Sequence, residues 1–137
     1  QQLLFSNAGK SLSANVLFSG FIRGDTQKKL LDRADVFVMP SVSEPFGLVA
    51  LEAAKQKTPV ILSKTSGAGE VLAGSPQVDF WDIKAMSAAV IKLLDDKKYR
   101  QEVIENQLAQ LNNLSWHNAA KKVERVYQKI LKLKKRA

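Results

Sequence analysis

The chain has 137 residues, of which 45% are hydrophobic and 25% charged, and this is the composition of one soluble globular domain. It contains no cysteine and one histidine, which excludes disulfide frameworks, thiolate nucleophiles and cysteine-based zinc sites. No apolar run approaches the roughly 18 residues that span a bilayer, and the first residues lack the layout of a signal peptide. We therefore expect a cytoplasmic protein whose chemistry uses carboxylates, amides and cations.

The net charge of +8 is concentrated at the C-terminal end of the chain. Residues 121–136 hold eight basic residues and one acidic residue, so the rest of the chain is nearly neutral. That neutral body lacks the basic patch, interleaved with stacking side chains, that nucleic-acid binding requires. For the basic segment two interpretations stay open: a solvated helix face, or attraction to anionic lipid headgroups at the inner face of the membrane.

Short apolar runs alternate with helical periodicity in the first half of the chain. The pattern predicts strands at residues 15–19, 35–39 and 59–62, and between them helices at 25–33, with Asp25 as N-cap, and at 47–55. Parallel strands need a crossover, which a helix usually supplies, so this order predicts a parallel α/β sheet. Such sheets bind ligands at the carboxyl ends of their strands.

The second half of the chain reads mainly as helices. We predict a short helix at 69–73, a weak edge strand at 77–80, and helices at 83–94 after the N-cap Asp82 and at 99–111. Ser115 is a good N-cap for a last helix. No repeat or linker divides the chain. Residues 1–137 therefore form one domain, in which 115–137 are a basic amphipathic C-terminal helix.

Residues 41–53 follow a predicted buried strand and open a helix, which is where anions bind to proteins. Free backbone amides there would point out of the helix start, and the helix dipole favours a negative group. The amides in question belong to Phe46, Gly47, Leu48 and Val49. Gly47 has no side chain, so a phosphate could approach the backbone closely.

Two carboxylates flank this predicted anion site. Glu44 and Glu52 are eight positions apart, which should keep them farther apart than the roughly 5 to 5.5 Å of a retaining glycosidase pair. Two separated acids with amides between them suit a long ligand that carries hydroxyls at both ends and phosphate in the middle. A nucleotide sugar has that shape.

The same stretch, with its flanks 35–41 and 58–61, carries a resemblance to a known family. The chain resembles the family 4 (group 1) glycosyltransferases through ordered landmarks, which are Glu-x7-Glu at 44–52, Ser19-Gly20-Phe21-Ile22, Glu44-Pro45-Phe46-Gly47, Ser66-Gly67-Ala68-Gly69-Glu70 and Leu114-Ser115-Trp116. The resemblance implies the two-domain GT-B fold, transfer with retention of configuration, and no bound metal or other cofactor. It implies that this chain is a partial C-terminal, nucleotide-sugar-binding domain: α/β, with a Rossmann-like parallel sheet flanked by helices.

The resemblance also implies roles for particular residues. Glu44 would be the catalytic residue and would hydrogen-bond the hydroxyls of the donor sugar. The backbone from Phe46 through Gly47 and Leu48 to Val49 would hold the sugar and its diphosphate. Glu52 would accept from the ribose hydroxyls, and Ile22 and Arg23 would border the base.

The chain departs from the family pattern in several places. By the resemblance, this sequence would lack the first strand, first helix and second strand of the domain, with an Arg and a Lys that share the diphosphate in the family. It would also lack the acceptor-binding N-terminal domain. We therefore expect the fragment alone to be inactive, with a gap in its sheet between the strands at 15–19 and 35–39. Lys57 stands where the family usually has Gly.

Alternative readings stay open at this point. The chain could be a non-catalytic nucleotide-sugar-binding or assembly module with the same fold. Arg23 could be a surface charge, and Gly67, Gly69 and Glu70 could form only a tight turn at a helix start. His117 has no expected catalytic task.

Overall fold

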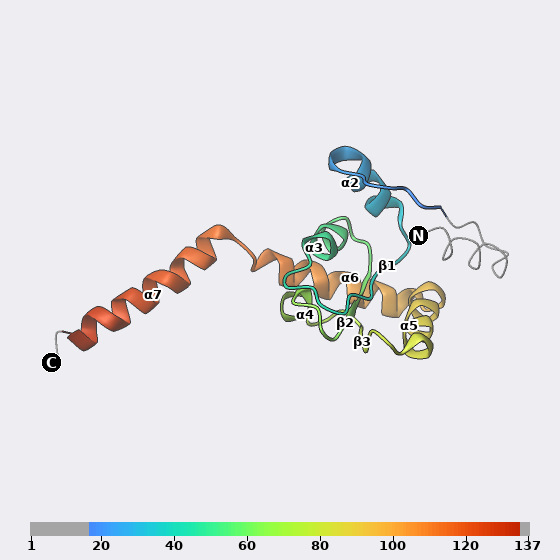
Figure 1. The fold of residues 1–137 in the computed structure, drawn as a ribbon. Helices are drawn as coiled ribbons and strands as arrows, with labels where there is room; N and C mark the ends of the chain where they lie inside the picture. Colours follow the sequence, from blue (N-terminus) through green and yellow to red (C-terminus); the bar gives the residue numbers. More distant parts are fainter. Residues whose placement is uncertain (1–16, 135–137) are drawn as a thin grey trace.

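The computed structural model describes residues 17–134 and shows helices packed around a small sheet (Figure 1). The elements in chain order are α2 (Gly24–Arg33), β1 (Phe37–Met39), α3 (Leu48–Lys55), β2 (Val60–Ser63), α4 (Ala68–Val71), β3 (Gln77–Val78), α5 (Ile83–Asp95), α6 (Lys97–Asn112) and α7 (Trp116–Lys134). Up to β3, helices and strands alternate, as the sequence predicted for an α/β fold.

The sheet has three parallel strands in the order β1-β2-β3. Phe37 pairs with Val60 and Met39 with Leu62, and Leu62 in turn pairs with Gln77. α3 forms the crossover between β1 and β2, and α4 forms the one between β2 and β3. The predicted parallel sheet is therefore confirmed for the strands at 35–39, 59–62 and 77–80, although each is short.

The core lies on both faces of β2, whose four residues are all buried. Successive side chains of a strand point to opposite faces, so Val60 and Leu62 join one apolar cluster and Ile61 joins another. The first cluster holds the buried side of α3, and the second holds Leu93 of α5 and Val103 of α6. Helices therefore cover both faces of the sheet, as in a Rossmann-like domain.

One predicted strand is wrong where the structure describes it. Leu17, Phe18 and Ser19 have no strand structure and are exposed, with Leu17 at 87%. Asn15 and Val16, the rest of that prediction, lie outside the described residues. An apolar run becomes a strand only when a neighbouring strand takes its backbone hydrogen bonds. Among the described residues, no strand lies beyond β1 to provide them.

The predicted helix starts are confirmed in two places and differ from the prediction in two others. Asp82 accepts a hydrogen bond from the Ala85 amide at 2.9 Å, and Ser115 accepts one from Asn118 at 3.1 Å. α6 begins two residues earlier than predicted because Asp96 caps it. Asp25 is not the N-cap of α2: Arg23 takes that position, and Asp25 lies in the first turn, where the helix dipole still favours it.

α7 extends away from the other elements (Figure 1). Within residues 17–134, it contributes no side chain to either apolar cluster. No helix in this part of the chain is long and apolar enough to cross a membrane. The helix is therefore held to the body mainly through the short connection after Asn112.

Lys57 has a φ of 66°, the left-handed region that glycine adopts without strain. It ends α3 by donating its amide to Ala54, while Thr58 donates to Ala53. We expect Lys57→Gly to raise the free energy of unfolding by about 1 kcal/mol, measured by urea denaturation. Lys55→Gly, inside the last turn of α3, should lower it by a similar amount. A loss of stability in both variants would contradict this account.

Candidate functional site

Glu44 lies in the loop between β1 and α3, at the carboxyl end of the sheet. Its carboxylate oxygen Oε1 accepts the Gly47 amide at 3.0 Å and, more weakly, the Phe46 amide at 3.4 Å. The sequence-based expectation that these two amides are free is therefore wrong, because the side chain three residues earlier already binds them. No protein hydrogen bond to the second oxygen of Glu44, Oε2, occurs within residues 17–134.

The next two amides do remain available. α3 begins at Leu48, and its first backbone hydrogen bonds run from Ala50 and Leu51 to the Gly47 carbonyl. In the described part of the chain, the amides of Leu48 and Val49 have no partner, as is usual in a first helical turn. That turn contains no acidic side chain. The start of α3 can therefore take an anion at Leu48 and Val49, beside the Glu44 carboxylate.

Gly47 also has a structural task, which the sequence did not predict. Its φ is 74°, and a Cβ added there would lie 2.8 Å from Met39 Cε and 2.9 Å from the Cβ of Ala68. Because Gly47 has no side chain, Met39 and Ala68 can pack closely against it. A left-handed turn at Gly47 is what brings the chain from Glu44 into α3.

A second loop, between β2 and α4, lies directly beside Glu44. Glu44 and Ser66 form an isolated parallel bridge, and the Gly67 amide donates to the Glu44 carbonyl at 2.8 Å. A Cβ on Gly67 would lie 2.0 Å from the Pro45 carbonyl oxygen, so only glycine fits. Gly67, which could have belonged only to a tight turn, therefore helps to support the Glu44 loop.

Two hydroxyl groups also join the loops after β1 and β2, closer to the strand ends. Ser63 and Thr65 both donate to the carbonyl oxygen of Ser41, at 2.6 and 2.9 Å. Ser63 is buried, so this bond is shielded from water. The loops after β1 and β2 are in this way joined along their length, from Ser41 to Gly67.

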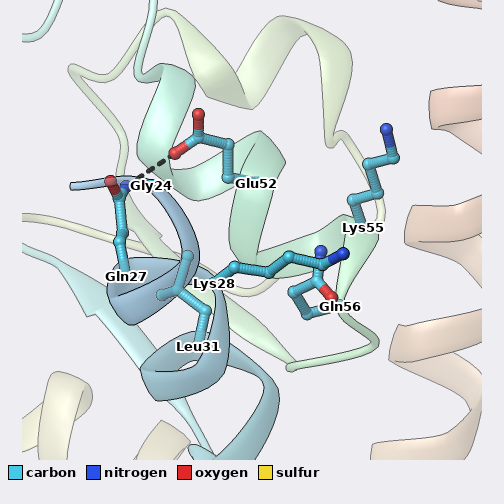
Figure 2. Close-up of a pocket in the computed structure, with 7 residues that line it drawn as sticks. All are labelled: Gly24, Gln27, Lys28, Leu31, Glu52, Lys55 and Gln56. Carbon is cyan, nitrogen blue, oxygen red and sulfur yellow. Dashed lines mark hydrogen bonds between the residues drawn. The ribbon is translucent and has the colours of Figure 1, made fainter.

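Glu52 lies on α3, in a pocket that α2 also lines (Figure 2). Its oxygen Oε2 accepts a hydrogen bond from Gln27 of α2 at 2.7 Å. The pocket holds about 280 Å³ and is also lined by Gly24, Leu31, Gln56 and two cations, Lys28 and Lys55. The two acids of the motif therefore have separate surroundings, Glu44 among backbone amides and Glu52 among side chains of α2 and α3.

The structure does not bring Ile22 and Arg23 into the Glu52 pocket. Ile22 lines a different hollow, on another side of α2, with Thr26 and Leu30. The guanidinium carbon of Arg23 lies 4.4 Å from the centre of the Phe21 ring, a cation–π contact. Of residues 22–24, only Gly24 borders the pocket of Glu52.

Sequence reasoning missed Gln27. Leu31 is the buried residue of α2, and Gln27 precedes it by one helical turn, so both lie on the face that meets α3. That spacing was visible in the sequence, but the partner on α3 was not. A group on a neighbouring helix can be found only when the packing of the two helices is known.

The arrangement is suited to holding a ligand by hydroxyl groups and an anionic group. Glu44 and Glu52 are acceptors, and the Leu48 and Val49 amides are donors between them in the chain. Within residues 17–134, no group of three or more His, Cys, Asp or Glu side chains gathers into a possible metal site. The chemistry that these residues offer is hydrogen bonding and charge stabilisation.

The sequence matches a family model over most of its length. Residues 3–110 match the model described as "Glycosyl transferases group 1". The chain is 38% identical over 118 residues to an uncharacterized glycosyltransferase of Methanocaldococcus jannaschii, covering 82% of this chain and 30% of that protein. It is 40% identical over 102 residues to a glycogen synthase of Mycobacterium tuberculosis, covering 72% of this chain and 25% of that protein.

Solved structures show the same likeness. A sucrose-phosphate synthase from Thermosynechococcus elongatus has a TM-score of 0.75 at 26% identity, covering 96% of this chain and 34% of that one. An α,α-trehalose 6-phosphate synthase from Burkholderia multivorans also has a TM-score of 0.75, at 21% identity, covering 99% and 32%. The chain thus spans about a third or less of these relatives, which have the GT-B fold that the resemblance implied. It belongs to the group 1 glycosyltransferases.

Proposed function

We propose that the chain is the donor-binding part of a retaining glycosyltransferase, which binds a nucleotide-diphosphate sugar and transfers its glycosyl group to an acceptor hydroxyl. The observation that supports this most is the surroundings of α3. Within residues 17–134, Glu44 precedes the first turn of α3 with one carboxylate oxygen unbound, and two unpaired amides follow. Glu52 faces a separate pocket. This order, an acid, two amides and a second acid, fits the sugar, the diphosphate and the ribose of a nucleotide-sugar donor.

In this proposal each group acts through hydrogen bonds. Glu44 Oε2 accepts from sugar hydroxyls and orients the ring, while Oε1 stays on the Gly47 amide. The Leu48 and Val49 amides stabilise the charge that grows on the diphosphate as its bond to the anomeric carbon breaks. The anomeric carbon forms a new bond to the acceptor oxygen with the same configuration, and the proton of the acceptor hydroxyl passes to the departing diphosphate. No metal ion or other cofactor takes part.

In this proposal Glu52 binds the ribose. The Gln27 side chain already holds Oε2, which leaves Oε1 to accept from a ribose hydroxyl. The base then lies toward the start of α2, where Ile22 and Arg23 are found. The acceptor is bound by a separate acceptor-binding domain, because transfer needs a closed cleft that excludes water from the donor.

We expect this chain to bind one of UDP, GDP or ADP, and Glu52→Ala to weaken that binding about 10- to 100-fold. A hydrogen bond to a charged group contributes roughly 1.5–3 kcal/mol, and its loss accounts for this range. Saturation-transfer NMR measures the contact, and the ribose protons should lose more signal than the base protons. Circular dichroism establishes that both proteins are folded.

Glu105→Ala removes another exposed carboxylate, from α6, and serves as the matched control. It should bind as the unchanged chain does. The donor-binding proposal fails if none of the three nucleotides contacts the folded chain. It also fails if the two alanine variants lose the same signal. A chain that binds nucleotide but supports no transfer when joined to its acceptor domain would be the non-catalytic module instead.

A further inference from the structure

Gln27 joins the two helices that border the pocket of Glu52. Its side-chain nitrogen Nε2, on α2, donates a hydrogen bond to Glu52 Oε2, on α3, at 2.7 Å (Figure 2). Gln27 precedes the buried Leu31 by one turn of α2, so its side chain leaves the helix on the face that meets α3. The carboxylate of Glu52 is therefore held by a side chain that lies 25 positions earlier in the sequence.

α2 has other contacts that keep it in place on α3. Leu31 is 6% exposed and belongs to the apolar cluster that also contains the buried side of α3. The hydroxyl of Thr58, which is buried, donates to the Leu31 carbonyl. A buried apolar side chain and a hydrogen bond shielded from water attach the helix more strongly than one hydrogen bond at the surface. The bond from Gln27 therefore sets the direction of the Glu52 carboxylate and adds little to the packing of α2.

The donor that holds Glu52 is uncharged, although two cations line the same pocket. Within residues 17–134, neither Lys28 nor Lys55 forms an ion pair with Glu52. Lys55 lies three positions after Glu52 on α3, a spacing at which helical ion pairs form. A lysine bound to Glu52 would neutralise the carboxylate and compete with incoming hydroxyl groups. The amide of Gln27 fixes the carboxylate and leaves its negative charge available to hydroxyl donors.

We propose that Gln27 is a positioning residue for nucleotide binding, which fixes the Glu52 carboxylate so that Oε1 is directed at the ribose hydroxyls before the nucleotide arrives. This inference rests on the proposed function, in which Glu52 binds the ribose. A side chain that is already ordered loses no further freedom when the ligand binds, so the ligand binds more tightly. Gln27 acts through Glu52 and makes no contact of its own with the ribose.

Gln27→Met tests the proposal, because it removes the hydrogen bond and keeps the length and volume of the side chain. We expect it to weaken the binding of whichever of UDP, GDP or ADP the chain binds about 3- to 10-fold, since Glu52 must then be ordered on binding. In saturation-transfer NMR the ribose protons should lose more signal than the base protons. The midpoint of urea denaturation should stay close to that of the unchanged chain, because α2 keeps its buried contacts.

Gln101→Met is the matched control. Gln101 of α6 donates to Glu105 at 2.8 Å, also between two side chains at the surface, and it does not line the pocket of Glu52. The control should bind the nucleotide as the unchanged chain does. Equal losses in the two methionine variants would overturn the proposal. Equal losses from ribose and base protons in Gln27→Met would also overturn it, because they would indicate a displaced α2 and not a freed carboxylate.

A double-mutant cycle tests whether Gln27 acts through Glu52. Adding Gln27→Met to Glu52→Ala should weaken binding no further, since no carboxylate remains to be oriented. Independent losses that multiply would mean that Gln27 contacts the ligand directly, which contradicts the proposal.

The outcomes separate this inference from the proposed function on which it rests. If the chain binds a nucleotide, loses affinity with Glu52→Ala and is unaffected by Gln27→Met, donor binding stands and only the role of Gln27 is disproved. If the folded chain binds none of the three nucleotides, both are disproved.

Discussion

Gly47→Ala should lower the free energy of unfolding by about 2–5 kcal/mol, a large part of the stability of a small domain. Two costs add at this position. A left-handed φ of 74° costs a residue with a side chain roughly 1–2 kcal/mol, and the new methyl group would overlap Met39 and Ala68, which costs about 1–3 kcal/mol more. Urea denaturation followed by circular dichroism measures the loss.

Gly20→Ala separates the two costs. Gly20 has a similar φ of 66°, but a Cβ there would meet no atom within 4 Å. We expect this variant to lose only the cost of the left-handed φ, about 1–2 kcal/mol. Equal losses at the two glycines would mean that the packing of the Glu44 loop against β1 and α4 contributes nothing. A larger loss at Gly47 assigns the difference to those contacts.

Glu44→Gln should reduce kcat of glycosyl transfer about 100-fold while leaving the affinity for the nucleotide nearly unchanged. The amide oxygen of glutamine can still accept the Gly47 hydrogen bond, so the loop keeps its shape. In the proposed donor site the variant loses a negative acceptor for the sugar hydroxyls, and a misplaced donor sugar reacts about 100-fold more slowly. Steady-state kinetics of this chain joined to its acceptor-binding domain measure the change.

Glu105→Gln is the matched control, an exposed carboxylate of α6 changed in the same way. Its kcat should stay within about twofold of the unchanged protein. Both variants should unfold within about 0.5 kcal/mol of the parent. If Glu44→Gln transfers at the parent rate, Glu44 has no catalytic role. If it instead loses several kcal/mol of stability, the carboxylate acts on folding and not on the donor.

The sequence predicted the elements whose signals are local. The N-caps Asp82 and Ser115 were read correctly, because a capping side chain and its amide lie three residues apart. The parallel sheet also followed, since buried β-branched runs alternate with helices. The position of Glu44 ahead of a helix was predicted for the same reason.

Features that depend on contacts between distant segments could not be predicted in this way. The run at 17–19 has the apolar character of a strand, but a strand also needs a neighbour, which periodicity does not reveal. Gly47 was correctly singled out for its missing side chain, yet the atoms that need the space, on Met39 and Ala68, are distant in the chain. The hydrogen bond from Gln27 to Glu52 joins residues 25 positions apart.

The pair of hydroxyl bonds to the Ser41 carbonyl has a consequence for binding entropy. Ser63 and Thr65 fix the loop that leads to Glu44 before any ligand arrives. A flexible side chain or loop that becomes ordered on binding costs affinity, about 0.5–1.5 kcal/mol for each side chain. Here that ordering takes place during folding. The affinity of a ligand at the start of α3 is then set by its own contacts, with little lost to arranging the protein around it.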